Sequence, residues 1–550
     1  MTRAALRLPL AGAAFIALAD TAIVALALPP ILRELDTDVA GVASVLGVYA
    51  VVLALALPAA ELGRRRTGTR LTGSAGVLLF ALGSLVCGVS GSLALLLVAR
   101  ALQAVGGAAV LVTAHALLAG DRIGSRAWRL AALLGFAAGP AIGGALTQAF
   151  GWRSIFLLQA PAALAALPAA LSVGPGHGRG APPGRDRRWP IGPVIALALA
   201  SGAVAAALFL TVLLLIAGWG IDPLVAAAAV SIMPLAALAA SRVAGPPAAL
   251  AAGGSLLVAA GTASLAFLPT ASVGWTVAPQ LAIGAGMGLA LPTLAGGLLP
   301  ERTGRDAALL LSIRHAGIAF ALLLLAPIAQ HELNTGLEET RERGAALILD
   351  APLDPGLKLD MAPRLADGVQ TENPRAGIER VFAAVRGDVD PDQLAAYDRL
   401  SERADETLVA GVNDGFATAF LVGAGLALLA AVAVAPRAAV RRPALAAGVA
   451  AAALAATAGY ALAADRARPE PVEIADPCQD RDLPSSGGLS GLGQDVALIA
   501  LDRIACRVGS SREELVLALV DDDSADRYEE RYGVDPRSAL NLAELAIPGL

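Results

Sequence analysis

The chain has 550 residues, of which 56% are hydrophobic and only 16% are charged; its net charge is -5 and its mean hydropathy is +0.67. This composition excludes a soluble globular protein, because successive apolar runs of about 20 residues are what bilayer spanning requires. The arginine clusters are short and adjoin these runs, where they set orientation. We therefore expect the lipid bilayer as a partner, and no nucleic acid.

The apolar runs fall into two sets of six and one further run. The first continues to Ile31 without a convincing cleavage site, and we interpret it as an uncleaved span rather than a secretory signal. The predicted spans are 9–32, 40–60, 71–89, 93–118, 128–149, 154–173, 191–217, 223–240, 248–268, 274–299, 307–329, 413–435 and 443–464.

This pattern predicts an all-α membrane protein with two six-helix bundles and one extra C-terminal transmembrane helix. Two polar regions interrupt or follow the spans, and both contain helix-like stretches, near Leu337–Leu349, near Gln393–Val409 and after the capping box at Ser511. The predicted parts are an N-terminal bundle (1–173), a cytoplasmic basic linker (174–190), a C-terminal bundle (191–435) with an extracytoplasmic insert (330–412), the extra helix (436–464) and an extracytoplasmic acidic tail (465–550).

Charge in the loops predicts the orientation. Arginines gather in every second loop, from Arg64–Arg66 after the second span to Arg441–Arg442 after the twelfth. The opposite loops, such as 88–92 and 269–272, are short and poor in arginine. The positive-inside rule then places the N-terminus in the cytoplasm and the C-terminus outside, in a bacterial cytoplasmic (inner or cell) membrane.

The cysteines agree with this orientation. Cys87 stands alone in the third span and is expected to be a small packing residue. Cys478 and Cys506 both lie in the tail, where an oxidising compartment permits a disulfide, and we predict one between them.

Charged residues at membrane depth are the best signal of a site, because each is costly unless it is paired or hydrated. Asp20 lies roughly 16 Å into the first span, and Arg100 lies roughly 10 Å from the outer face on the antiparallel fourth span. In a core about 30 Å thick these depths nearly coincide. We predict that they meet, that Gln103 extends the polar track, and that proton loading of Asp20 weakens the pair. A static structural ion pair is the alternative.

Other polar residues within the spans are candidates for lining a substrate cavity: Arg314, Gln148 and Gln280, with Gln159 as a further polar position. Enzyme signals are absent from the sequence. No phosphate-binding G-x-x-x-x-G-K-[ST] loop occurs, and no Cys or His pair has metal-ligand spacing. We expect no enzymatic activity, no catalytic residues, no cofactor and no metal site.

The stretch 135–144, Gly-Phe-Ala-Ala-Gly-Pro-Ala-Ile-Gly-Gly, has glycines at every fourth position. On a helix, Gly135, Gly139 and Gly143 share one face and allow a neighbouring backbone to approach closely. Pro140 removes a backbone donor and favours a bend. This pattern is typical of a gate or hinge between packed helices, and equally of a small-residue packing seam.

These residues together resemble the major facilitator superfamily, within it the drug:proton antiporters. Residues 18–29 are similar to L-D-x-T-I-V-N-V-A-L-P, with Ala22 and Ala25 in place of Thr and Asn. Residues 100–106 resemble R-x-x-Q-G-x-G, which that group associates with proton coupling, with Ala104 for the first glycine. Residues 135–144, including Gly144, match the antiporter motif G-x-x-x-G-P-x-x-G-G at every specified position.

One motif departs from the family pattern. The family's cytoplasmic gate loop G-x-L-A-D-R-x-G-R-R falls on residues 57–65, which keep Gly63, Arg64 and Arg65 but lack the aspartate. Glu61 lies one position away and is expected to substitute electrostatically.

The resemblance implies a proton-coupled antiporter that exports small drug-like or amphipathic organic compounds by alternating access, with protons and a small-molecule substrate as partners. The alternatives are a metabolite uniporter or importer of the same fold, or a non-transporting membrane scaffold or sensor. In the last case an extracytoplasmic protein partner would bind through 330–412 or 465–550.

Overall fold

The computed structural model describes residues 3–119, 122–174, 189–299, 303–369, 374–439, 443–484 and 488–538. All regular elements in these ranges are helices, in agreement with the predicted fold class. The first bundle contains α1 (Arg3–Ala25), α2 (Leu28–Glu34), α3 (Val39–Thr67), α4 (Thr69–Gly88), α5 (Leu93–Leu118), α6 (Arg122–Phe150), α7 (Arg153–Leu164) and α8 (Leu167–Leu171). The second contains α9 (Ile191–Leu213), α10 (Pro223–Val230), α11 (Ile232–Ala240), α12 (Pro247–Ser264), α13 (Val273–Pro292), α14 (Gly304–Asp350) and α17 (Leu394–Ala439).

Short non-α turns extend several of these helices, namely the π-helices η1 (Leu214–Gly218) and η3 (Thr293–Leu298) and the 3-10 turn η2 (Leu265–Phe267). Within the described residues, eleven segments are long and apolar enough to cross a membrane, which makes the chain a multi-pass membrane protein. Thirteen spans were predicted from the sequence. The other two fall on α6 and on α18 (Pro443–Asp465), which are helical, but α18 counts only as a shorter apolar helix, Ala450–Asp465.

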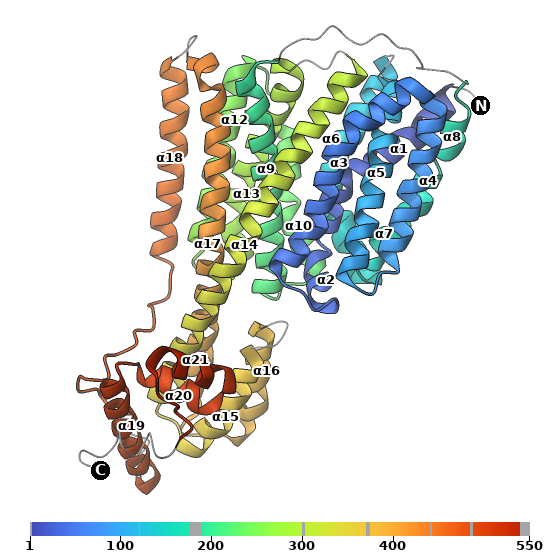
Figure 1. Cartoon of the computed structure of the whole chain (residues 1–550). Helices are drawn as coiled ribbons and strands as arrows, with labels where there is room; N and C mark the ends of the chain where they lie inside the picture. The colour runs from blue at the N-terminus through green and yellow to red at the C-terminus, as the bar shows by residue number, and fades with distance from the viewer. Residues whose placement is uncertain are drawn as a thin grey trace.

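The insert does not begin as a separate domain. α14 has 47 residues and would be about 70 Å long at 1.5 Å per residue, more than twice the roughly 30 Å of a hydrocarbon core. Neither residue 330 nor residue 412 interrupts a helix, so α14 and α17 both leave the bundle as continuous rods (Figure 1). The sequence between Gln330 and Asp350 is rich in Glu, Leu, Ala and Arg, which explains why the helix continues.

The far ends of α14 and α17 carry a helical appendage (Figure 1). We use this name for residues 330–412 together with 465–538, which include α15 (Pro355–Val369), α16 (Pro374–Val385), η4 (Arg386–Asp388), α19 (Gly488–Val508), α20 (Arg512–Val520) and α21 (Asp522–Tyr532). The appendage lies at the end of the molecule opposite the start of α1, and α18 stands beside α17 and α12 at one edge of the bundle.

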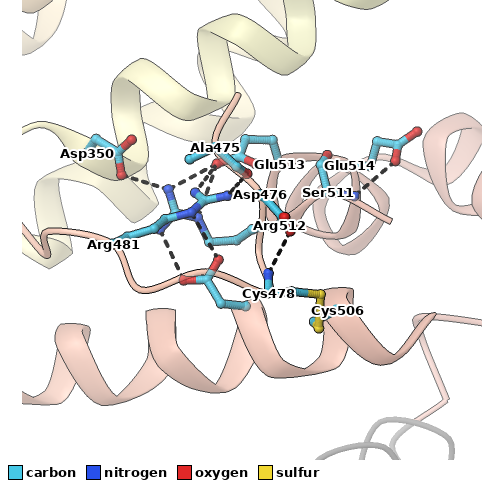
Figure 2. A network of polar contacts seen from close by, with 11 residues as sticks. Asp350, Ala475, Asp476, Cys478, Arg481, Cys506, Ser511, Arg512, Glu513 and Glu514 are labelled. Carbon is cyan, nitrogen blue, oxygen red and sulfur yellow. Dashed lines mark hydrogen bonds and ion pairs between the residues drawn. A yellow bond between two sulfur atoms is a disulfide. The ribbon is translucent and has the colours of Figure 1, made fainter. Parts of the chain in front are cut away.

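The tail is stabilised by a disulfide within it and by ion pairs, including one that joins it to α14. Cys478 and Cys506 form a disulfide, as predicted, which holds the segment before α19 against that helix. Arg512 is fully buried, and its Nη2 donates to Asp350 at the end of α14 (2.7 Å) and to Glu513 (3.0 Å) (Figure 2).

Arg481 completes this buried charge network from the disulfide-linked segment. Its Nη1 donates to the same Glu513 oxygen (2.9 Å), and its side chain lies 3.6 Å from Asp502 of α19. A buried charge that loses its partner is costly, so these contacts favour one defined position of the tail on the insert.

In the bundle, the glycines of α6 pack directly on α1. A Cβ added to Gly135 would lie 3.1 Å from the carbonyl oxygen of Phe15, and one on Gly139 would lie 2.6 Å from Ala22 Cβ. A Cβ on Gly143 would lie 2.2 Å from the carbonyl oxygen of Ile23. The expectation that these glycines share one face and admit a neighbouring backbone is therefore confirmed.

Gly144 faces the other bundle. A Cβ there would lie 2.2 Å from Ala227 Cβ and 2.9 Å from the Pro223 carbonyl oxygen, both on α10. α6 is thus wedged between α1 of its own bundle and α10 of the second. A second junction between the bundles joins α3 and α14, where Ser312 Oγ donates to the Ala54 carbonyl (2.6 Å) and Val39 N donates to Gln330 (2.8 Å).

Replacing Gly143 and Gly12 by alanine should have opposite effects on stability. An alanine at Gly143 overpacks the α1–α6 contact and should cost about 1–3 kcal/mol. Gly12, on α1, has nothing within 4 Å of an added Cβ, so the same change there should be neutral or stabilising through helix propensity. Thermal unfolding of the detergent-solubilised variants measures the difference. Equal shifts for both variants would contradict the close packing described for α6.

Candidate functional site

Asp20 and Arg100 form an ion pair inside the first bundle. Arg100 Nη2 donates to Asp20 Oδ2 at 2.6 Å and Nη1 donates to Asp20 Oδ1 at 3.0 Å. Both residues have zero solvent exposure. The depths estimated from the two antiparallel spans predicted this meeting, and the prediction is confirmed.

Two glutamines close the pair into a ring. Gln103, one turn after Arg100 on α5, accepts from Arg100 Nη1 at 2.6 Å and donates to Gln159 of α7 at 2.7 Å. Gln159 in turn donates to Asp20 Oδ1 at 3.2 Å. Ser84 of α4 accepts a further bond from Gln103 at 2.8 Å. Four helices of the first bundle therefore converge on one buried polar network.

Arg100 has partners that do not depend on Asp20. Its Nε donates to the Val45 carbonyl of α3 (3.1 Å), and its guanidinium lies 4.2 Å from the ring centroid of Tyr49 and 5.6 Å from that of Phe156. These contacts hold the guanidinium to the backbone of α3 and against two aromatic rings, one on α3 and one on α7. Asp20, by contrast, accepts only from Arg100 and Gln159 in the described part of the chain.

The sequence predicted only some members of this network. Gln159 was considered as a cavity-lining position, whereas it completes the ring. Tyr49, Ser84 and Phe156 were not singled out. The one usable signal was Tyr49, since a tyrosine inside an apolar run needs a partner for its hydroxyl, and its Oη donates to the Ala17 carbonyl at 3.1 Å.

The gate-loop candidates form a second charged cluster, where α3 meets the start of α14. Glu61 is almost fully buried and accepts two bonds from Arg64 (2.8 and 2.9 Å) and one from Arg65 (2.9 Å). A Cβ on Gly304, the first residue of α14, would lie 3.0 Å from the Glu61 carboxylate. The carboxylate therefore sits at a helix N-terminus, which favours negative charge. Gly63 has no neighbour within 4 Å of an added Cβ, and its carbonyl accepts from Thr67 Oγ1 of the same helix at 3.0 Å.

The predicted cavity candidates lie on three different helices and share no hydrogen bond within the described residues. Arg314 is half-buried on α14, its Nε is shielded from solvent, and it has no hydrogen bond or ion pair within the described residues. Gln280 is fully buried on α13; it donates to Thr276 at 2.8 Å and leaves its oxygen without a partner. Gln148 is exposed near the end of α6 and belongs to neither group.

No cluster of three or more His, Cys, Asp or Glu residues with a geometry suited to a metal ion occurs in the described part of the chain. The buried network contains one carboxylate, that of Asp20, whose charge is balanced by one guanidinium, that of Arg100. Breaking such a pair by removing one charge is expensive, typically about 3–5 kcal/mol, unless the structure rearranges. Loss of either charge would therefore favour a rearrangement of the helices around the pair.

Comparison with known proteins shows similarity to proteins named for drug resistance and export. The chain is 36% identical over 162 residues to the Multidrug resistance protein B homolog of Mycobacterium tuberculosis (strain ATCC 25618 / H37Rv), covering 28% of this chain and 30% of the relative. It is 37% identical over 163 residues to the Tetracenomycin C resistance and export protein of Streptomyces glaucescens, covering 28% and 30%. The match thus spans less than a third of these relatives.

The fold resembles that of a bacterial homolog of the human lysosomal transporter Spinster, solved in an inward-facing, unoccupied conformation. The TM-score is 0.50 at 18% identity, with 79% of this chain and 98% of that chain covered. The family profile described as Major Facilitator Superfamily matches residues 10–322, more than half of the chain. The chain therefore belongs to the Major Facilitator Superfamily.

Proposed function

We propose that the protein is a proton-coupled antiporter that exports small amphipathic organic compounds by alternating access. The observation that carries this proposal is the fully buried, bidentate Asp20–Arg100 pair, closed by Gln103 and Gln159. Relatives named for drug resistance and export support the direction of transport.

In the proposed cycle, a proton reaching Asp20 neutralises the carboxylate and weakens its attraction to Arg100. Arg100 is held in place by the Val45 carbonyl, Gln103 and the Tyr49 ring, so Asp20 and its helix α1 are the parts free to shift. Loss of the proton restores the pair and returns α1. Proton binding thus selects between two positions of α1, which is what coupling to a conformational equilibrium requires.

The movement would reach the second bundle through α6. The residues that meet the α6 glycines, Ala19, Ala22 and Ile23, flank Asp20 on α1. Because that contact is between backbones with no room for side chains, α1 and α6 move together. Gly144 on the same helix abuts α10. A shift of α1 would therefore open or close the seam between the bundles.

Arg314 supports an anionic or neutral substrate rather than an obligatory cation. It is a half-buried cation in the second bundle without a partner in the described residues, whereas Asp20 is already paired. An anionic group on the substrate would supply the missing partner and offset the cost of desolvating the guanidinium. Gln280, with a free buried oxygen, would offer an acceptor to a polar substrate group.

The proposed orientation follows the arginine-rich loops, with the N-terminus in the cytoplasm and the appendage outside. The appendage lies opposite the start of α1 and contains a disulfide, which is the arrangement this orientation requires.

Asp20→Asn should abolish coupling while leaving binding of the substrate intact. The amide mimics the protonated side chain but cannot release a proton. In proteoliposomes with an imposed pH gradient, phenylnaphthylamine extrusion should drop to the level of empty vesicles, and proton release driven by the dye should vanish. Exchange of dye across the membrane without a gradient should persist and serves as the control for folding. Gradient-driven extrusion by Asp20→Asn at the wild-type rate would refute the coupling role.

Arg314→Gln should alter selectivity by charge. Anilinonaphthalene sulfonate and phenylnaphthylamine share one aromatic skeleton and differ in the anionic group. Loss of a charge-assisted hydrogen bond of about 1.5–3 kcal/mol should lower transport of the sulfonate about tenfold or more, with little change for the amine. Arg314→Lys should retain part of the sulfonate transport. An equal loss for both dyes would assign Arg314 a structural role instead.

A further inference from the structure

The appendage encloses an apolar cavity that the transport proposal does not use. Its volume is about 170 Å³. Helices α14, α15, α16, α17 and α20 all contribute to its wall, through Ala345, Leu365, Phe382, Leu408 and Leu517 respectively. The cavity therefore lies where the insert meets the tail, and it exists only while α20 is docked.

A lysine stands in this wall. Lys358 of α15 is only 7% exposed, and its Nζ donates to the Leu349 carbonyl at 2.9 Å. An ammonium has three donors, so two remain after this bond. No carboxylate pairs with Lys358 within the described ranges, and the nearby Asp350 is bound to Arg512. Burial lowers the pKa of Lys358 to about 8, in keeping with an ammonium that lacks a counter-ion.

The other charges at the cavity do not satisfy this lysine. Arg341 also lines the wall and adds a second positive charge. The one acid that lines it, Asp521, caps α21 by accepting from Ser524 N at 3.0 Å and from Ser524 Oγ at 2.6 Å. The cavity thus presents apolar walls and an excess of positive charge, which together suit an amphipathic anion.

A glycine in the wall keeps the cavity open. Gly344 lies within α14, where a glycine costs about 1 kcal/mol relative to alanine. A Cβ added there would meet nothing within 4 Å, whereas one on Gly336 of the same helix would lie 3.1 Å from the Gly411 carbonyl oxygen. Close helix packing therefore explains why residue 336 is a glycine, but it does not explain the glycine at position 344.

We propose that this cavity is a binding site for a small amphipathic carboxylate, whose apolar body fills the space beside Gly344 and whose carboxylate bonds to Lys358. The volume fits this size of ligand, since an apolar cavity of about 150 Å³ accommodates benzene. The ligand would touch both α14 and α20, so its binding would also strengthen docking of the tail on the insert. The inference does not depend on the direction or coupling of transport.

The test uses the full-length protein in lipid nanodiscs and fluorine NMR of para-trifluoromethylbenzoate. The neutral probe para-trifluoromethylbenzyl alcohol and empty nanodiscs are the comparisons. The wild type should broaden and shift the benzoate signal beyond that of empty nanodiscs. Lys358→Met should weaken benzoate binding about tenfold, the loss expected for one charge-assisted hydrogen bond, while binding of the alcohol changes little.

Gly344→Leu should abolish binding of both probes, because the added side chain would occupy the cavity and its Cβ would meet no neighbour within 4 Å. Gly425→Leu is the matched control: Gly425 lies on α17 in the bundle, also with open space around its Cβ, and should bind as the wild type does. Wild-type signals no different from empty nanodiscs, or unchanged benzoate binding in Gly344→Leu or Lys358→Met, would overturn the proposal. An equal loss of acid and alcohol in Lys358→Met would overturn the assignment of the carboxylate to Lys358.

Discussion

The buried ion pair between Asp20 and Arg100 is the constraint around which the first bundle is arranged. Two full charges without solvent exposure are tolerable only when every donor and acceptor is satisfied. The chain meets this requirement with side chains from α1, α4, α5 and α7 and with a backbone carbonyl from α3. In the proposed cycle, a proton bound to Asp20 would remove one of these two charges and so favour movement among these helices.

The glycines of α6 link α1, which carries Asp20, to the second bundle. At Gly143 an added Cβ would lie 2.2 Å from a carbonyl oxygen of α1, and at Gly144 it would lie 2.2 Å from Ala227 of α10. Contacts this close leave no space between the helices, and in the proposed cycle a displacement of α1 would therefore be transmitted to the seam between the bundles. The Glu61 cluster, lying against the first turn of α14, joins the bundles at a separate place.

Sequence patterns predicted the features that depend on periodicity and depth. Hydropathy located the spans, the depths of Asp20 and Arg100 predicted their contact, and the four-residue glycine repeat predicted close packing. The tail cysteines predicted their disulfide. Features that depend on three-dimensional convergence were not predictable in this way. Gln159 completes the ring only because α7 packs beside α1 and α4, within hydrogen-bonding distance of Gln103 on α5. Ser84 carries no distinguishing sequence pattern.

The structure of the insert was also only partly predictable from sequence patterns. Its polar composition suggested a separate region, but good helix formers carry α14 and α17 without a break from the bundle into the appendage. Docking of the tail on these helices, through Arg512 and Asp350, links residues 162 positions apart in the sequence. The cavity between insert and tail is a product of that docking, and no single segment of the sequence could have revealed it.

In the proposed transport cycle, Asp20 gains and loses a proton. Infrared difference spectroscopy of the protein in lipid, between acidic and alkaline conditions in the presence of phenylnaphthylamine, tests it directly. We expect the wild type and Glu61→Gln to show a carbonyl band of a protonated carboxylic acid that is missing from Asp20→Asn, whose remaining bands come from the other carboxylates of the chain. An Asp20→Asn spectrum that retains every carbonyl band of the wild type would contradict this, because the wild-type bands would then come from other carboxylates and Asp20 would remain ionised throughout.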